Sequence, residues 1–254
     1  KQFTVDNRTT ARLPQKLKYP IVLFEPEDLR LIQGSPTRRR QFIDRLISQI
    51  DPIYSVNLRK YERALKQRNN LLKQQPSSNQ IFVWDVSISE YGEYIVNKRL
   101  EFIAELDKKI TDAYQKISKT KDNISITYSY PGSKNLKQKI LNDLSANFRR
   151  DIITGNTSVG PHRHDVLFSL NDKSAGSTAS RGEVRTIILG LKFIEVEIIE
   201  EKTGKKPIVL LDDVFSELDE TRQKALSDTI HDNQIIITST HTLSDSKSFK
   251  EIRL

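Results

Sequence analysis

The sequence predicts an α/β fold in which a mainly helical second lobe is inserted into a lobe built on a parallel sheet. The apolar run Ile208–Leu211 has the length and branching of a strand buried on both faces. With Ile235–Thr238 and the helix between them it forms a β-α-β unit with parallel strands. Much of residues 26–154, by contrast, carries apolar positions at helical spacing. We therefore assign residues 1–25 and 155–254 to the α/β lobe and residues 26–154 to the helical lobe.

The first 25 residues contain two expected strands. Phe3–Val5 is a short apolar segment that ends at a turn formed by Asp6 and Asn7, and Ile21–Phe24 is a second, fully apolar run. Together they resemble the end of a sheet-containing unit.

Helices are expected through most of the inserted lobe. Residues 37–50 and 53–74 carry helix-period apolar positions, with Asp51 and Pro52 breaking between them. A long helix follows, and its apolar positions are Ile88, Ile95, Phe102, Leu106, Ile110, Ala113 and Ile117. A half-exposed strand at residues 124–128 and a basic helix reaching about Ile153 complete the lobe.

The α/β pattern then resumes. We expect a strand at Val166–Leu170, a turn at residues 171–173 and a helix at Arg181–Glu201. A further helix over about residues 217–231 connects the two parallel strands.

The composition restricts the class of protein. An apolar fraction of 36% with 29% charged residues is ordinary for a folded chain. No apolar run approaches the roughly 18 residues that cross a bilayer, and no signal peptide is visible, so we expect no membrane association and a cytoplasmic protein. The absence of cysteine excludes disulfides and thiolate metal sites. The absence of methionine, with Lys1 first, suggests an internal or processed piece of a longer protein.

Positive charge is concentrated in residues 36–73, which carry ten Lys and Arg against three Asp and Glu. Clustered cations bind a phosphate backbone by releasing its condensed counterions, although a solvated helix face gives the same pattern. The candidate DNA-binding residues are Arg38, Arg39, Arg40, Arg59, Lys60, Arg63, Lys66 and Arg68. The first three could instead stabilise the junction between the lobes.

Paired carboxylates follow the strand that ends at Leu211. At the carboxyl end of a parallel strand, Asp212 and Asp213 suit hard-cation chemistry, in which one carboxylate holds Mg²⁺ and the other orients or deprotonates a water. An acidic turn after a strand is the structural alternative.

A second motif begins the helix at Arg181. Ser180 and Glu183 have the spacing of a capping box, which explains them structurally. The same helix N-terminus, with Gly182 in its first turn, is also an anion site where free amides and the helix dipole favour phosphate. No glycine-rich phosphate loop ending in Gly-Lys-Ser or Gly-Lys-Thr occurs in the sequence.

The histidines are weaker indicators of a functional site than these two motifs. His241 follows the strand at Ile235–Thr238 and could reach the same sheet edge as Asp213, although a lone loop histidine is more often simply solvated. His162, His164 and Asp165 form the one candidate metal cluster of the sequence. We do not expect a zinc site there because further ligands at suitable spacing are missing.

The order of these motifs resembles the RecF family of bacterial recombination and repair ATPases, which belongs to the ABC and SMC-like ATPase class with a P-loop NTPase fold. Six segments carry the resemblance: Phe24–Leu29, Gly34–Arg40, Ala64–Asn69, Ser158–Arg163, Ser180–Thr186 and Leu210–Asp219.

The resemblance implies roles for individual residues. Asp212 would be the Walker B ligand of Mg²⁺, Asp213 the catalytic carboxylate and His241 the switch histidine that contacts the terminal phosphate. Residues Ser180, Arg181, Gly182 and Glu183 resemble the signature motif that covers the γ-phosphate of ATP across a dimer interface, and Ser216 and Asp219 belong to a segment similar to the D-loop.

The resemblance also implies a function. The family is expected to form an ATP-dependent homodimer with slow hydrolysis, to bind double-stranded or gapped DNA, and to load recombinase together with RecR and RecO. Two features depart from the family pattern: His164 stands where an acid is usual, and the Walker A loop is missing from the sequence.

Two alternatives remain. The first is a non-catalytic fragment that binds DNA or a partner protein through its helical lobe. Another SMC-like ATPase would need a far longer coiled coil than residues 26–154 allow.

Overall fold

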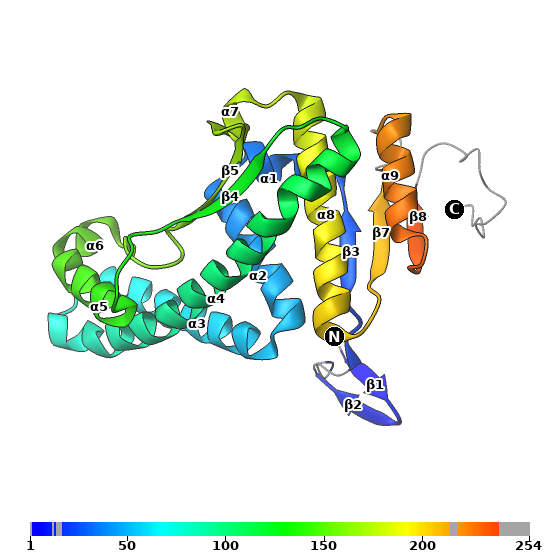
Figure 1. Ribbon diagram of the computed structural model, residues 1–254. Coiled ribbons are helices and arrows are strands. Elements are labelled where there is room, and N and C mark those ends of the chain that lie inside the picture. Colours follow the sequence, from blue (N-terminus) through cyan, green and yellow to red (C-terminus); the bar gives the residue numbers. More distant parts are fainter. Residues whose placement is uncertain (1, 12, 14–16, 214–217, 239–254) are drawn as a thin grey trace.

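A parallel sheet organises the α/β lobe of the computed structural model, shown in Figure 1. The structure describes residues 2–11, 13, 17–213 and 218–238. The sheet has the order β3-β7-β8, with β3 at Ile21–Phe24, β7 at Ile208–Asp212 and β8 at Ile235–Thr238. Asp212 is level with Thr238 in the register. Both strand pairs are parallel, as the β-α-β pattern predicts.

One face of this sheet forms a core with three helices. Alternate side chains of β3 and β7 are at most 2% exposed: Val22, Phe24, Val209 and Leu211. They pack against α8 (Arg181–Thr203), α9 (Glu220–Ile230) and the end of α4 (Ser78–Ser118). Burial of one side of each strand explains why the apolar runs specify this register.

The second face of the same sheet is open over the described part of the chain. Ile21 is 43% exposed and Ile236 is 51% exposed, while Ile208 and Leu210 are half-buried. The prediction that Ile208–Leu211 is buried on both faces is therefore met on one face only.

The N-terminal residues form a separate hairpin. Strands β1 (Phe3–Val5) and β2 (Arg8–Thr10) pair antiparallel around Asp6 and Asn7, which both have positive φ, 49° and 63°. Two consecutive residues of this conformation match the right-handed twist of a hairpin, and Asn and Asp tolerate it. The predicted strands at Phe3–Val5 and Ile21–Phe24 and the turn at Asp6 and Asn7 are confirmed, and the two strands lie in different sheets.

Three long helices build the inserted lobe. Helix α2 spans Pro36–Ile50, α3 spans Pro52–Leu72, and α3 packs along α4 over most of its length (Figure 1). The break between α2 and α3 is local: the Asp51 carboxylate accepts hydrogen bonds from the backbone N–H groups of Ile53 and Tyr54, at 2.8 and 3.1 Å. This N-cap satisfies two donors that the first turn of α3 leaves free.

Shorter elements complete the molecule. The basic helix predicted to end near Ile153 is two helices, α5 (Leu136–Ala146) and α6 (Phe148–Thr154), which meet at Asn147. Segments η2 (Pro26–Leu29), α1 (Arg30–Gln33) and α7 (Ala175–Thr178) are single turns.

A second sheet connects the two predicted lobes. Strand β4 (Ile124–Ser129) pairs antiparallel with β5 (Asp165–Leu170), which pairs with β6 (Lys173–Ser174). Since β4 lies within residues 26–154 and β5 follows them, this sheet crosses the boundary drawn from the sequence. The division into lobes stays a prediction.

Candidate functional site

The paired carboxylates lie at the carboxyl end of β7, where they were expected. The Thr238 hydroxyl donates a hydrogen bond to the Asp212 carboxylate, with 2.6 Å between Oγ1 and Oδ1. The Asp213 backbone N–H donates to the Thr238 carbonyl at 3.1 Å. Asp212 is exposed and Asp213 half-buried. Carboxylate and hydroxyl oxygens suit Mg²⁺, which commonly takes one or two protein carboxylates and completes its shell with phosphates and water.

The backbone at Asp213 is unusual. Its φ is +50°, in the left-handed region that few residues other than glycine adopt. Such conformations cluster at functional sites, where they re-aim a side chain. The strand ends at Asp212, one residue before this conformation.

The first turn of α8 shows the predicted capping box. The Glu183 N–H donates to the Ser180 hydroxyl at 3.3 Å, and the Ser180 N–H donates to the Glu183 carboxylate at 2.6 Å. The carboxylate therefore occupies the amide that a bound anion would use. Arg181 is exposed at the same helix end.

Arg222 joins this turn to the first turn of α9, so that the two helix N-termini lie side by side (Figure 1). Its guanidinium donates to the Gly182 carbonyl at 3.0 Å and to the Thr186 hydroxyl at 2.7 and 2.9 Å, and it forms an ion pair with Asp219. Asp219 also caps α9 by accepting from the Arg222 N–H at 2.9 Å. Arg222 does not belong to any motif recognised in the sequence. It follows the capping residue Asp219 by three positions, which was the available signal.

Two predicted site residues lie outside the described residues. They are Ser216 and His241, so the roles assigned to them stay predictions.

The two histidines lie beside tyrosines, with His164 buried and His162 half-buried. The Tyr61 hydroxyl lies 2.6 Å from His162 Nδ1, and the Tyr128 hydroxyl lies 2.9 Å from His164 Nδ1. Burial lowers the pKa of each histidine to about 4, with further lowering by the nearby arginines. No group of three His, Cys, Asp or Glu within the described ranges is placed to hold a metal ion.

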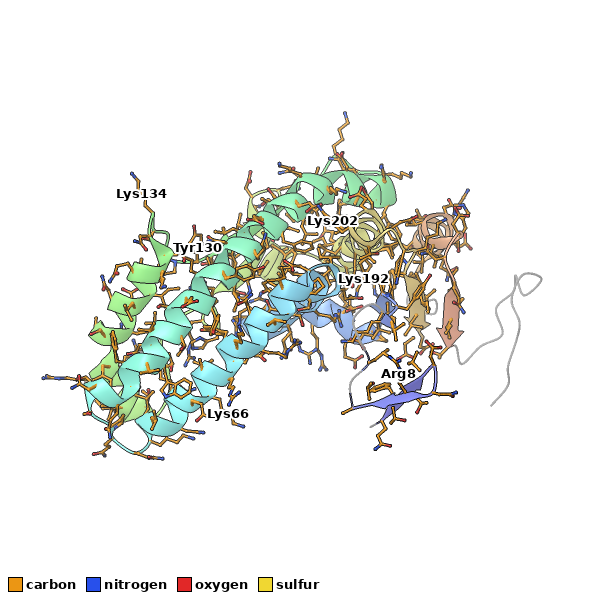
Figure 2. The ribbon with its side chains drawn as sticks, turned by 90° about the horizontal axis from the view of Figure 1, so that it is seen from below. Arg8, Lys66, Tyr130, Lys134, Lys192 and Lys202 are labelled. Atoms are coloured by element: carbon orange, nitrogen blue, oxygen red, sulfur yellow. The ribbon has the colours of Figure 1, made fainter. Side chains whose placement is uncertain are left out.

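The basic segment separates into exposed and structural cations. Five of its candidate residues are exposed: Arg38, Arg59, Lys60, Arg63 and Lys66. Arg59, Arg63 and Lys66 follow the i, i+4, i+7 spacing of one face of α3, and no ion pair to any of the three is found among the described residues. Figure 2 shows Lys66 on the outer side of that helix.

Arg39 and Arg40 form bonds across the boundary between the predicted lobes. Arg39 forms a bidentate pair with Asp165 at the start of β5, with both N–O distances 2.8 Å, and Arg40 donates to the His164 carbonyl at 2.7 Å. These contacts support the alternative that the arginines stabilise the junction between lobes.

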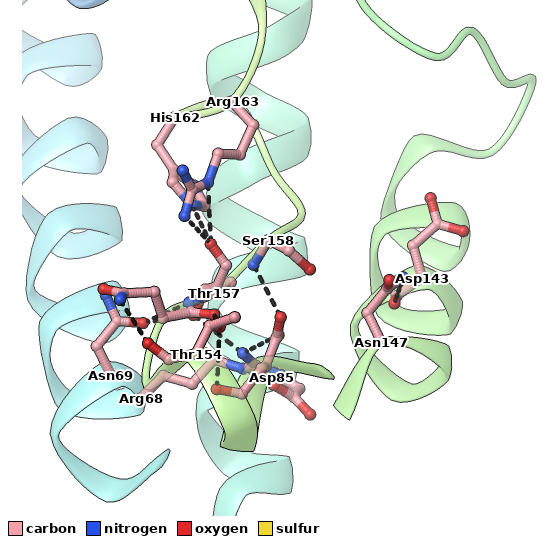
Figure 3. Close-up of polar contacts among 12 residues, drawn as sticks. Arg68, Asn69, Asp85, Asp143, Asn147, Thr154, Thr157, Ser158, His162 and Arg163 are labelled. Atoms are coloured by element: carbon pink, nitrogen blue, oxygen red, sulfur yellow. Dashed lines mark hydrogen bonds and ion pairs between the residues drawn. The ribbon is translucent and has the colours of Figure 1, made fainter. Parts of the chain in front are cut away.

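The assignment of Arg68 to DNA binding is wrong. Its side chain is 0% exposed, and its guanidinium donates to Asp85 at 2.5 Å, Asp151 at 2.6 Å and the Thr157 hydroxyl at 2.9 Å (Figure 3). A cation enclosed by these partners joins α3 to α4 and α6 and cannot reach a phosphate.

Comparison with known proteins decides the family. No family model matches the chain. The DNA replication and repair protein RecF of Streptococcus uberis is 44% identical over 228 residues, which are 87% of this chain and 62% of that protein. RecF of Streptococcus suis is 41% identical over 238 residues, 89% of this chain and 65% of that protein. A solved structure of the recombination mediator protein RecF with ATP, in the RecFOR pathway, has a TM-score of 0.85 at 32% identity and covers 96% of this chain and 68% of its own.

The chain belongs to the RecF family. The likeness to the RecF structure confirms the predicted fold class, an α/β lobe of the ABC-type ATPase class with a mainly helical second lobe. The chain spans 62% to 65% of the length of the curated RecF relatives named above. None of the described helices combines the length and apolarity needed to cross a membrane.

Proposed function

We propose that this chain is the larger part of an ATP-dependent DNA-binding protein that acts in recombinational repair in the bacterial cytoplasm. The observation that carries the proposal is the arrangement of three elements at one end of the sheet. Asp212 and Asp213 lie at the carboxyl end of β7, and the first turns of α8 and α9, bonded through Arg222, lie toward the same end (Figure 1). In open α/β sheets this is the edge at which ligands bind.

ATP with Mg²⁺ is the proposed cofactor. Asp212 would hold the ion, which when bound neutralises charge on the transferred phosphoryl group, and Asp213 would orient or deprotonate the attacking water. Binding of ATP by a similar protein, the RecF structure with ATP, supports this assignment.

The signature turn of α8 is proposed to meet ATP held by a second copy of the protein. Ser180 and Glu183 bond to each other in the single chain, so the Ser180 amide becomes available to a phosphate when the Glu183 carboxylate moves away. A helix N-terminus then offers both amides and dipole to the anion. This supports an ATP-dependent homodimer.

A phosphate loop must come from outside residues 1–254, whose sequence contains none. The open apolar face of the sheet, with Ile21 and Ile236 about half exposed, supports a further layer there, since parallel sheets are normally covered on both faces. We propose that the additional length of RecF relatives supplies both the layer and the loop.

Double-stranded or gapped DNA is the proposed macromolecular ligand. The cation row Arg59, Arg63 and Lys66 on α3 supplies the contact surface, together with Arg38 and Lys60. RecR-like and RecO-like proteins are the proposed partners, supported by the RecFOR pathway named for the similar structure.

The first test measures ATP turnover by the full-length protein that contains this chain, with and without duplex DNA. We expect DNA-stimulated turnover in the wild type and its loss in Asp213→Asn. Asp172→Asn is the matched control, because Asp172 also has a positive φ, 63°, and lies in the turn between β5 and β6. If the wild type binds DNA but does not turn over ATP, the chain is instead a non-catalytic DNA- or partner-binding protein.

The same preparation tests the DNA surface. Arg63→Ala and Lys66→Ala should each weaken binding similarly for all sequences and reduce the salt slope of binding by about 1. Lys202→Ala, at the far end of α8, is the control. Equal losses in all three variants would reject the α3 row as the contact surface.

A further inference from the structure

We propose that Arg222 is a positioning residue that couples Asp219, the N-cap of α9, to the signature turn of α8, which is residues 180–183. The coupling sets whether the signature turn can engage ATP held by a second copy, and it therefore rests on the function proposed above. No residue role implied by the family resemblance includes Arg222.

The contacts of Thr186 define the coupling on the α8 side. Its hydroxyl donates to the Gly182 carbonyl at 2.9 Å and accepts from Arg222 Nε at 2.9 Å and from Nη2 at 2.7 Å. A hydroxyl has one proton and two lone pairs, so this set uses its full capacity. Thr186 is 0% exposed, and each of these bonds is costly to leave unmade.

The Gly182 carbonyl receives a second bond from Arg222 Nη2 at 3.0 Å. Because Gly182 lies within the signature turn, this bond fixes the backbone whose amides face an incoming phosphate. An added Cβ at Gly182 would lie 3.6 Å from Arg222 Nη2, so the guanidinium packs closely over the turn.

The opposite edge of the guanidinium binds Asp219. Nη1 forms an ion pair with Asp219 Oδ2, while the backbone N–H of Arg222 donates to Oδ1. One planar group therefore spans the carboxylate that caps α9 and the carbonyl and hydroxyl of α8. Lysine cannot do the same, because its ammonium is a single point of charge without the fork of donors.

A displacement of Asp219 is thus transmitted to the signature turn. We expect loss of Arg222 to leave ATP binding by one copy unchanged, since the guanidinium bonds to Gly182, Thr186 and Asp219 at the starts of α8 and α9. The affinity of the ATP-dependent dimer should fall, because the signature turn is no longer held.

The test uses the full-length protein with Arg222→Gln, Arg222→Lys, Thr186→Val and the double variant Arg222→Gln with Thr186→Val. ATP affinity at low protein concentration, dimer affinity with ATP by analytical ultracentrifugation, and the melting temperature are measured for each. Lys224→Gln is the control, because it removes one exposed cation from the same helix.

We expect the dimer dissociation constant to rise about tenfold in each single variant, the scale of one or two hydrogen bonds to a charged group. ATP affinity should stay within about twofold of the wild type. The double variant should be no worse than the poorer single variant, since the two side chains act through one contact. Arg222→Lys should not restore the dimer.

The proposal is overturned if Arg222→Gln dimerises with the affinity of the wild type. It is also overturned if the effects of Arg222→Gln and Thr186→Val on dimer affinity are fully additive. Hydrogen exchange without nucleotide separates it from the proposed function. If the wild type forms no dimer with ATP, the proposed function fails. The positioning role is still established if the amides of Val184–Ile187 exchange faster in Arg222→Gln than in the wild type. Unchanged exchange there rejects the positioning role.

Discussion

At the scale of single residues, a buried cation organises the distal end of the helical lobe. Arg68 faces Asp85 and Asp151, so two carboxylates and one guanidinium share a site closed to solvent. Burial raises the pKa of Asp85, and the hydrogen bond from Arg68 opposes that shift. The guanidinium therefore compensates charges that the protein interior disfavours.

We predict that Arg68→Met lowers the free energy of unfolding by about 3–5 kcal/mol, because it leaves two buried carboxylates without a counterion. Lys66→Met on the exposed side of α3 is the control and should change it by less than about 0.5 kcal/mol. Urea unfolding monitored by circular dichroism measures both. Equal stabilities of the two variants would show that the buried network contributes no net stability.

At the scale of elements, α4 is the support on which α8 is placed. Gly190 of α8 packs against α4, where an added Cβ would lie 3.5 Å from Ala113 Cβ and 3.5 Å from Ile110 Cδ1. Close approach of the two helices at this point fixes the position of α8, and with it the first turn of that helix.

The space at Gly190 allows one methyl group. We predict that Gly190→Ala is neutral or raises the free energy of unfolding by up to about 1 kcal/mol, since alanine favours the helix and 3.5 Å is an ordinary contact. Gly190→Leu should lower it by about 1–3 kcal/mol through overpacking. Thermal unfolding of both variants checks the prediction, and an equally stable Gly190→Leu would mean that the two helices separate freely.

At the scale of the whole molecule, one polar network crosses the junction between the predicted lobes. Arg99 of α4 forms a bidentate pair with Asp44 of α2, with both N–O distances 2.8 Å, and donates to the Pro161 carbonyl at 2.8 Å and to the Tyr128 hydroxyl at 3.1 Å. Tyr128 in turn contacts His164. The junction is thus a set of mutually satisfied buried groups, which favours a fixed relation between its two sides.

Stability should therefore depend on pH through His164. Its pKa is lowered to about 4 in the folded state from an ordinary value of about 6.5, chiefly by burial. As pH falls from 6.5 toward 4, His164 is protonated in the unfolded chain but stays neutral in the folded chain. The stability that is present above pH 6.5 is therefore lost through this window.

The variant His164→Asn isolates that contribution. Urea unfolding at pH 7 and pH 5 should show a smaller loss of stability in the variant than in the wild type, because other titrating groups contribute equally to both. An identical loss in the two proteins would show that His164 is not held neutral by the fold.

Much of the architecture and part of the site could be predicted from the sequence. The helices predicted near residues 37–50 and 53–74, the break between them at Asp51 and Pro52, the capping box at Ser180 and the parallel β-α-β unit whose first strand leads to Asp212 are confirmed. Each of these features depends on residues a few positions apart. Helix period, capping spacing and strand length can therefore be recognised in short stretches of sequence.

The sequence by itself thus determined the class of the fold, the place of the carboxylates and the family resemblance. Only the tertiary structure decided which cations face solvent, that β4 pairs with β5, and that Arg222 joins the first turns of α8 and α9. The physical reason is distance along the chain. The partners of Arg68 are 17 and 83 residues away, and the contact of Arg222 with Gly182 spans 40, so neither burial nor bonding follows from local pattern.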